Sequence, residues 1–397
     1  MTPPRRDAPP RLIDDAAAAD DSFFTAPYGL LAHRKIRAMV QRKLILPQRP
    51  IDEAQYQPAS LDLRLGPEAY RVRASFLPGR GRTVREHLAT LNPERISLTG
   101  DGAVLEKGIV YIAPLLEWLD LRRSISGAAN PKSSTGRLDI FTRLIVDGSE
   151  AFDAVPLGYR GPLYVEISPR SFSVRVREGS KLNQIRFRVR NSRQKSVVDF
   201  ALSDKKIRAR HAKTPLVDGP LDLREGLIMR VALSGPQGAI IGYRAQKNSD
   251  IIDVDRPAGY DAREFWEPIH ARPDHRLILD PDEFYILASR EKMQIPADLA
   301  AEMAPIDPAI GEFRVHYAGF FDPGFGQGAD GEPCARAVLE VRSRDVPFLI
   351  EDGQPVGRLV YEKLAEQADE LYGATAVSNY QGQGLKLSKH FRAFDAA

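Results

Sequence analysis

The chain has 397 residues, of which 43% are hydrophobic and 27% charged, and its formal net charge at pH 7 is +3. This composition is typical of a soluble globular protein, no apolar run approaches the length that spans a bilayer, and the mild charge demands no DNA- or RNA-binding surface. We therefore expect neither a membrane nor a nucleic acid as partner. The single cysteine, Cys334, excludes an intramolecular disulfide framework and a multi-cysteine metal site, and it predicts a reducing compartment, the cytoplasm.

The N-terminal residues contain two predicted elements. Residues 1–25 are rich in Pro, Arg, Ala and Asp without periodicity, which predicts a disordered leader. Its aspartates argue against a transit peptide, and it has no apolar core typical of a secretory signal. From Tyr28 to about Leu44, apolar residues recur at helical spacing among Arg and Lys, so we predict one amphipathic helix there.

Most of the remaining chain is predicted as strand. Short segments alternate apolar with polar residues between Gly and Pro turns, at 60–65, 109–112, 163–167, 172–176, 284–287, 314–317, 337–341 and 358–361. This pattern favours antiparallel sheets, so we predict an all-β fold with a few helices, arranged as two compact β-barrel or jelly-roll domains. Residues 191–225 lose periodicity and gain charge, and we place the junction there, between domains at 26–205 and 206–364.

The C-terminal tail, residues 365–397, differs from both domains. A stretch from Ala365 to Tyr372 is predicted as helix, and the segment Ser378–Gly384 contains Gly, Tyr and Gln residues. Glycines leave the backbone mobile, while Tyr and Gln offer a stacking face and amide donors. Two interpretations stay open, a frayed terminus or a lid that closes over a ligand.

The chain also contains an internal repeat. Residues 105–119 are echoed by 279–293, and Glu166 is echoed by Glu340 at an offset of 174 residues. At the same offset, the cluster Ser133–Arg137 falls on Asp307–Gly311, which has no such hydroxyls. A duplicated fold that keeps this polar cluster in one copy only indicates that the two copies have divided one task.

Three groups of residues are candidates for chemistry. Lys132, Ser133, Ser134 and Arg137 can form a helix N-terminus that attracts a phosphate, although an ordinary capped surface helix explains the pattern as well. Glu166 and Glu340 lie on mostly apolar strands, where burial would raise the carboxyl pKa into the range useful for proton transfer, unless they point outward. Phe321 and Asp322 precede a tight turn, where aromatic rings could sandwich a planar ring and the carboxylate could accept a sugar hydroxyl.

Five motifs in this order resemble those of dCTP deaminase, a relative of trimeric dUTPase. They are Gln57–Gly66, the Ser-Ser-x-x-Arg cluster at 133–137, residues 315–325 (VHYAGFFDPGF), the Val-Leu-Glu strand at 338–340 and Tyr-Gln-Gly-Gln at 380–383. The resemblance covers most of residues 28–392 and indicates the double-length form of that enzyme. It implies two tandem dUTPase-like domains that deaminate dCTP to dUTP and ammonia without zinc, feeding dUMP and dTTP synthesis, with Mg²⁺ bound to the triphosphate.

The resemblance also implies a role for each matching residue. It assigns Ser133 to holding the attacking water or the base, Arg137 to charge stabilisation, and proton transfer to Glu340 or Glu166. It assigns Lys132 and Ser134 to substrate binding. The family usually has Arg in place of Lys132. Asp322 would meet the deoxyribose beside Phe321, and Tyr372, Tyr380 and Gln383 would close over the triphosphate. Since a zinc deaminase needs a P-C-x-x-C pair, the single Cys334 independently argues against zinc.

Neither copy carries the complete set of motifs. The simplest hypothesis is a composite site, in which Lys132, Ser133 and Arg137 of the first copy face Asp322, Glu340 and the tail of the second, within one chain or between chains of a homo-oligomer. Two alternatives stay open. One is a dUTPase or a bifunctional deaminase that forms dUMP, and the other is a non-catalytic nucleotide-binding regulatory module.

Overall fold

The computed structural model describes residues 28–190, 200–305, 319–343, 345–374 and 378–394, together with the backbone of 313–316. The leader predicted at 1–25 lies outside these residues. We call residues 28–190 the first half and residues 200–394 the second half. The helices are α2 His33–Gln41, α3 Val84–Leu91, α4 Ser133–Gly136 and α5 Asp204–His211, with 3-10 turns η2 Glu53–Gln55 and η4 Ala262–Glu264. In the described part of the chain, none of the helices combines the length and apolarity needed to cross a bilayer.

Strands dominate both halves, which confirms the predicted all-β class. The first half contains β1 Gly29–Leu30, β2 Ile45–Pro47, β3 Leu61–Leu63, β4 Glu68–Val72, β5 Glu94–Ser97, β6 Ala103–Leu105, β7 Val110–Asp120, β8 Ile125–Pro131, β9 Ile140–Val146, β10 Ala154–Val155, β11 Arg160–Pro169, β12 Val174–Val176 and β13 Asn183–Val189. The second half contains β14 Leu227–Arg230, β15 Ile240–Ala245, β16 Ile252–Asp253, β17 Trp266–His270, β18 Arg276–Leu279, β19 Tyr285–Met293, β20 Leu299–Ala304, β21 Phe313–His316, β22 Phe320–Phe321, β23 Ala335–Ser343, β24 Phe348–Glu351 and β25 Pro355–Lys363. Every segment predicted as strand overlaps one of these.

The two halves repeat one topology. Strands β4, β7, β11 and β9 are neighbours in one sheet of the first half, and β15, β19, β23 and β21 follow the same order in the second. The pairs β13–β8 and β12–β6 likewise match β25–β20 and β24–β18. An offset of 174 residues carries β11 onto β23 to within one residue at their first positions. The internal repeat read from the sequence is therefore a repeat of structure.

The first helix is shorter than the sequence predicts. Helix α2 begins at His33 and buries Ile36 and Met39. Residues 29 and 30 instead form β1, whose Gly29 pairs with Val189 of β13. The apolar residues before α2 contribute to a sheet edge, which helical periodicity alone does not distinguish from a helix face.

Helix α5 lies across the predicted domain boundary at 205/206. Its buried residue is Ile207, and the rest of its surface is polar, so hydrophobic periodicity had no stripe from which to indicate a helix. The boundary itself stays a prediction.

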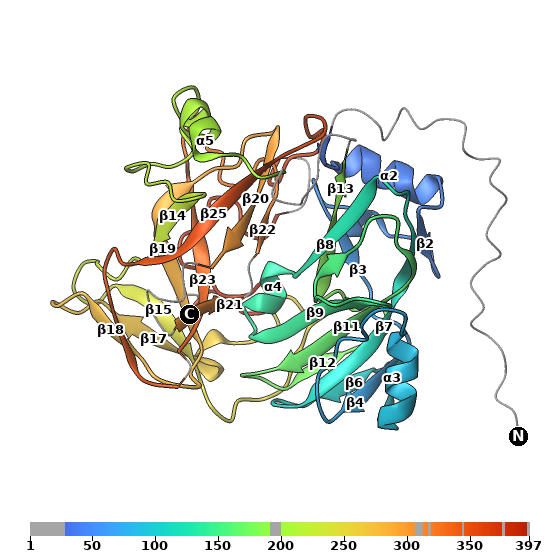
Figure 1. Ribbon diagram of the computed structural model, residues 1–397. Helices are drawn as coiled ribbons and strands as arrows, with labels where there is room; N and C mark the ends of the chain where they lie inside the picture. Colours follow the sequence, from blue (N-terminus) through green and yellow to red (C-terminus); the bar gives the residue numbers. More distant parts are fainter. Residues whose placement is uncertain are drawn as a thin grey trace, which may run out of the picture.

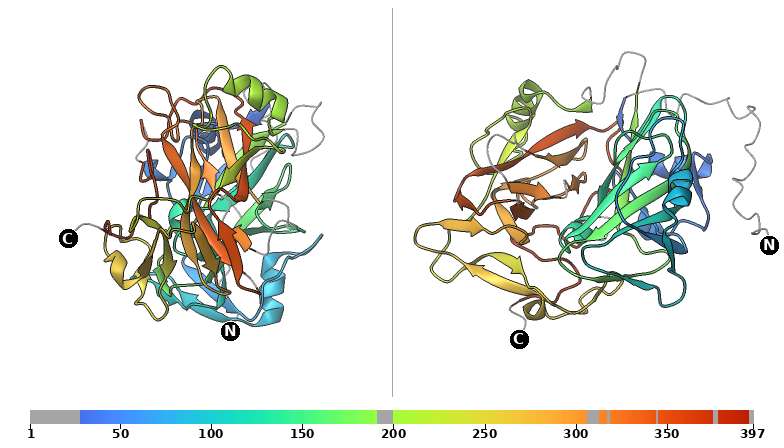
Figure 2. Two further views of the ribbon diagram at one scale, coloured as in Figure 1. Left: turned by 90° about the vertical axis from the view of Figure 1, so that its left-hand side faces the viewer. Right: turned by 60° about the horizontal axis from the view of Figure 1, so that its bottom comes forward.

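The two halves lie side by side and share one of the hydrophobic cores (Figures 1 and 2). Phe172 of the first half packs with Phe265 and Trp266 of the second, with ring centroids 5.8 and 5.4 Å apart. Strand β16 of the second half adds to β12 of the first in parallel register. Apolar packing and one strand pairing thus join the two halves.

The tail takes a different path from the one predicted. The helix expected over Ala365–Tyr372 is wrong, because this stretch contains bends and irregular backbone and has no helical residue. Its backbone bonds to other elements: the amide of Ala365 donates to the carbonyl of Leu30 at 2.8 Å, and that of Tyr372 donates to Pro323 at 2.8 Å. A chain whose amides are used in this way cannot make i to i−4 bonds.

Beyond residue 378 the tail returns across the junction between the halves. Ser388 Oγ donates to the carbonyl of Ser134 at 2.8 Å, and an imidazole nitrogen of His390 lies 2.8 Å from the carbonyl of Val254. Phe391 is buried against Trp266, with ring centroids 6.0 Å apart. The frayed-terminus interpretation is therefore wrong for residues 378–394.

Candidate active site

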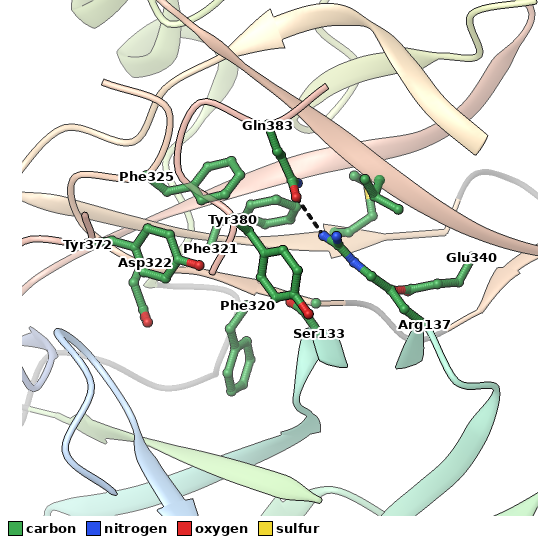
Figure 3. Close-up of a pocket in the computed structure, with 13 residues that line it drawn as sticks. Ser133, Arg137, Phe320, Phe321, Asp322, Phe325, Glu340, Tyr372, Tyr380 and Gln383 are labelled. Carbon is green, nitrogen blue, oxygen red and sulfur yellow. Dashed lines mark hydrogen bonds between the residues drawn. The ribbon is translucent and has the colours of Figure 1, made fainter. Parts of the chain in front are cut away.

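A pocket lies where α4 of the first half meets β20, β22, β23 and the tail of the second (Figure 3). It encloses about 580 Å³ of space free of atoms, open solvent at its mouth included. Its lining comes from both halves of one chain: Ser133, Arg137, Met303, Gly319, Phe320, Phe321, Asp322, Phe325, Val338, Glu340, Tyr372, Tyr380 and Gln383.

Helix α4 presents Ser133 and Arg137 to this pocket. It is a single turn between β8 and β9, closed by the amides of Thr135 and Gly136, which donate to the carbonyl of Lys132 at 2.8 and 2.9 Å. Ser133 and Arg137 are four residues apart, so the turn projects both side chains from one face. The spacing of the Ser-Ser-x-x-Arg cluster thus has a local structural reason.

The guanidinium group of Arg137 is held by the tail. Its two terminal nitrogens donate to the carbonyl of Lys386 and to Oε1 of Gln383, both at 2.9 Å, and its central carbon lies 3.9 Å from the ring centroid of Tyr380. Its Nε is buried and has no hydrogen-bond partner among the described atoms. A buried cation with one unused donor is suited to stabilising negative charge in the pocket.

Glu340 supplies a buried carboxyl group beside Arg137 (Figure 3). Burial raises the pKa of Glu340 to about 8, with the positive charge of Arg137 opposing the rise and the negative charge of Asp139 adding to it. A carboxyl group that titrates close to neutral pH can both accept and return a proton. This is the chemical property that distinguishes the pocket.

Asp322 closes the other side of the pocket and is held from the first half. A terminal nitrogen of Arg186 on β13 donates to its carboxylate at 2.8 Å, and the guanidinium carbon of Arg186 lies 4.1 Å from the ring centroid of Phe320. Burial raises the pKa of Asp322, and Arg186 opposes that rise. The carboxylate is therefore fixed in one orientation.

Aromatic rings form the remaining wall. The ring of Phe325 lies 5.2 Å from that of Phe321 and 5.5 Å from that of Tyr372, centroid to centroid. Burial raises the pKa of Tyr372 to about 12, so its hydroxyl stays protonated at neutral pH. Gln383 is oriented by its Nε2, which donates to the carbonyl of Arg336 at 3.0 Å.

Three of the residues predicted from the sequence do not line the pocket. Lys132 forms an ion pair with Asp62, and the carbonyl of Ser134 accepts a hydrogen bond from Ser388. Glu166 lies in the first half, where it accepts from Arg143 at 2.7 Å and from Ser75. The structure buries both glutamates, but it brings only Glu340 together with Ser133 and Arg137.

Sequence reasoning missed part of the lining. Phe320 and Phe325 lie in the quoted motif at 315–325 and Val338 in the one at 338–340, so the motifs contain the signal, although Phe321 is the only apolar residue that the sequence analysis selects from them. Met303 lies on β20 in an unremarkable apolar strand, and no pattern in the sequence distinguishes it from core. Arg186 was also missed, since its partner Asp322 is 136 positions away.

Known proteins match the chain over both halves. The models of the 2'-deoxycytidine 5'-triphosphate deaminase N-terminal and C-terminal domains match residues 27–192 and 203–391. A crystal structure of 2'-deoxycytidine 5'-triphosphate deaminase from Agrobacterium tumefaciens is 50% identical, with a TM-score of 0.80 over 85% of this chain and 99% of that one.

Curated relatives match shorter stretches. A protein from Mycolicibacterium smegmatis named dCTP deaminase, dUMP-forming, is 28% identical over 187 residues, 46% of this chain and 91% of its own. A protein of the same name from Kocuria rhizophila is 32% identical over 118 residues, 29% of this chain and 58% of its own. The chain thus spans less than two thirds of the length of that second relative.

The tandem antiparallel units and the pocket between them define a protein of the dUTPase-like class. Within that class, the chain belongs to the 2'-deoxycytidine 5'-triphosphate deaminase family, in a form that carries both domains in one polypeptide. The resemblance inferred from five short motifs is therefore confirmed at the level of the family.

Proposed function

We propose that this protein deaminates dCTP hydrolytically to dUTP and ammonia in the pocket between its halves. The observation that carries the proposal is the buried carboxyl group of Glu340, with a pKa of about 8, beside Arg137 and Ser133. Membership of the family supports dCTP as the substrate. Proton transfer by a group titrating near the working pH is the efficient arrangement for such a reaction.

In the proposed reaction one carboxylate, that of Glu340, transfers both protons of the attacking water. Glu340 accepts a proton from water as the oxygen adds to C4 of the cytosine, and it returns that proton to N3. It then moves the second water proton from the new hydroxyl to the amino nitrogen, the C4–N bond breaks and ammonia leaves. Ser133 holds the water or the base, and Arg137 stabilises the charge that develops.

The same proposal assigns the remaining residues to the nucleotide. Asp322, fixed by Arg186, accepts from the deoxyribose beside Phe321, while Tyr372, Tyr380 and Gln383 cover the triphosphate. Lys132 and Ser134 approach the phosphates from the first half. For Lys132 this requires that phosphate competes with Asp62 for the ammonium group.

We propose that Mg²⁺ enters with the triphosphate. Lys132 and Ser134 offer an ammonium group and a hydroxyl, which suit phosphate oxygens better than a metal, and the described residues contain no group of three or more His, Cys, Asp or Glu that could hold an ion. Phosphate oxygens and water would then supply the ligands, which is the coordination that Mg²⁺ usually adopts.

Incubation of the purified protein with dCTP and Mg²⁺ tests the proposal. We expect stoichiometric release of ammonia and dUTP. Absence of ammonia with unimpaired dCTP binding would overturn it in favour of the non-catalytic regulatory module.

A second candidate, the bifunctional deaminase that forms dUMP, is favoured by the printed names of the curated relatives. Both reactions need the same fold, so the distinction lies in the products. Chromatography of the reaction mixture separates them: dUMP and pyrophosphate indicate the bifunctional enzyme, whereas dUTP alone indicates the deaminase. The same mixtures started from dUTP detect a dUTPase.

A further inference from the structure

A buried contact lies two residues beyond Arg137 and Glu340, which line the same pocket. Asp139 follows α4 in the first half, and Arg342 follows Glu340 on β23. The Nε of Arg342 lies 3.2 and 3.1 Å from the two carboxylate oxygens of Asp139, and one terminal nitrogen also contacts that carboxylate. Since residues i and i+2 of a strand share a face, Glu340 and Arg342 point toward the first half together.

This contact is buried, and its polar atoms also form hydrogen bonds with neighbouring residues. Asp139 is 0% exposed and Arg342 is 9% exposed. Ser171 donates to Asp139 at 2.7 Å, and Arg342 donates to Ser171 at 3.1 Å and to the carbonyl of Asp282 at 2.8 Å. A planar guanidinium group bound at several points fixes orientation as well as distance.

The duplication contains this contact only once. At the offset of 174 residues, Asp139 corresponds to Phe313 and Arg342 to Ser168, so the equivalent ion pair cannot form beside Glu166. The hydroxyl of Ser168 is buried without a hydrogen-bond partner among the described atoms, and Glu166 is instead neutralised directly by Arg143. The pair thus accompanies the glutamate that lies in the pocket and not its duplicate.

We propose that Asp139 and Arg342 are positioning residues, which lock β23 to the end of α4 and so fix the carboxyl group of Glu340 opposite Arg137. The inference rests on the proposed function for its consequence in turnover, because Glu340 and Arg137 come from different halves and must be held in register for proton transfer. The position of the pair also gives Asp139 an electrostatic effect on Glu340, since its negative charge disfavours ionisation of a nearby carboxyl group.

Other charged or titratable groups around Glu340 must be separated from this effect. Arg137 faces it from α4, Asp322, Tyr372 and Tyr380 line the same pocket, and Arg342 follows on its own strand. In the backbone register, Glu340 pairs with Ile286 of β19 and with His316 of β21. A His316→Gln variant identifies any contribution of that imidazole to the pH dependence.

The test compares Asp139→Asn and Arg342→Lys with the matched control Arg188→Gln. Arg188 forms another buried pair between the halves, with Glu362 at 2.8 Å, and removing one partner of such a pair destabilises the fold in either place. The readouts are thermal stability, ammonia release from dCTP over pH, and the titration of Glu340 by carboxyl ¹³C NMR, assigned with Glu340→Gln.

In Asp139→Asn, the titration of Glu340 and the corresponding limb of the pH profile should move to lower pH by about one pH unit, because a nearby negative charge is removed. Arg342→Lys keeps the charge but loses the forked donors, so the titration should stay and kcat should fall about tenfold or more with a smaller change in KM. Arg188→Gln should lower thermal stability without either change.

The inference is overturned if Asp139→Asn and Arg342→Lys behave like Arg188→Gln, losing stability while the titration of Glu340 and kcat stay those of the wild type. Failure of the proposed function has a different signature, since wild-type protein would then release no ammonia from dCTP. In that case the NMR titration still decides whether Asp139 acts on Glu340, and Arg342→Lys provides a second variant if Asp139→Asn does not fold.

Discussion

At the residue scale, Glu340 carries a stability penalty that its proposed role explains. Burial raises its pKa from 4.5 to about 8, so its neutral form suits the folded state and its ionised form does not. The direction of the effect on stability follows from linkage. Compared with a side chain that cannot ionise, Glu340 does not lower the free energy of unfolding below pH 4.5, but it lowers it as pH rises through 8. The difference corresponds to roughly 5 kcal/mol above pH 8, at about 1.4 kcal/mol for each pKa unit.

We therefore predict that Glu340→Gln raises the melting temperature by several degrees at pH 8, while the two proteins differ little at pH 4.5. Glutamine has the shape of the carboxylic acid and cannot ionise, so the gain must grow with pH. Thermal unfolding of both proteins between pH 4.5 and pH 9 checks this. A difference independent of pH would show that Glu340 does not titrate as described.

The pH dependence of turnover is a second prediction for the same residue. If the carboxylate accepts the proton of water, kcat/KM should rise with pH through about 8, the pKa of Glu340, and level off above it. Ammonia release at dCTP concentrations well below KM measures this limb. A profile that falls across this range would mean that the protonated acid starts the reaction.

At the element scale, the tail is the part whose conformation matters most for binding. Phe391 anchors its end in the shared core, against Phe265 at 5.4 Å and Trp266 at 6.0 Å between ring centroids, and is not among the residues that line the pocket. We predict that Phe391→Ala releases the tail, so that KM for dCTP rises about tenfold or more and limited proteolysis cuts the tail earlier.

A matched control for this prediction is Phe76→Ala. Phe76 stacks on His87 at 4.9 Å in a separate cluster of the first half, so its removal tests the general effect of losing an aromatic contact. It should leave KM near the wild-type value. Equal effects of both substitutions on KM would argue against the lid.

The elements differ in how far sequence predicts them. Strands such as β11 were found because their side chains alternate and turns bound them. Helix α4 was indicated only as a possible helix start, since four residues carry no periodicity. The tail was mistaken for a helix because its backbone partners, Leu30 and Pro323, lie far away in the sequence and leave no local pattern. Predictions from local sequence patterns fail where backbone groups distant in the sequence supply the hydrogen bonds.

The same dependence on residues distant in the sequence explains which site residues could be predicted. Ser133, Arg137, Asp322 and the tail residues could be picked out because motifs carry them, but Glu166 and Glu340 have equivalent sequence contexts. What separates them is their neighbours in space: Arg143 neutralises the first, whereas Arg137 and Asp139 flank the second. These neighbours follow from how the halves pack, which a single sequence does not encode in any short pattern.

At the scale of the whole molecule, the shared core predicts joint unfolding. Phe265 and Trp266 of the second half pack on Phe172 of the first, so the core of the first half extends into the second. We predict one cooperative calorimetric transition for the full chain. Two resolved transitions would mean that the halves are independent domains.

The expectation of a homo-oligomer stays a prediction, which sedimentation analysis tests.

Zinc independence likewise stays a prediction for the whole protein. We expect that phenanthroline, which binds zinc tightly and Mg²⁺ poorly, leaves turnover unchanged when Mg²⁺ is in excess. Removal of Mg²⁺ with EDTA should lower turnover, and added Mg²⁺ should restore it. Loss of activity in phenanthroline, with recovery on addition of zinc, would contradict the proposed metal-free water activation.

The central claim is that one pocket, built from both halves of one chain around Glu340, performs the chemistry. The most direct measurement compares ammonia release from dCTP by Glu340→Gln and Glu166→Gln, each confirmed as folded by circular dichroism. We predict that Glu340→Gln abolishes turnover, whereas Glu166→Gln retains much of it despite the loss of the buried pair with Arg143. Retained turnover in Glu340→Gln with loss in Glu166→Gln would contradict the account.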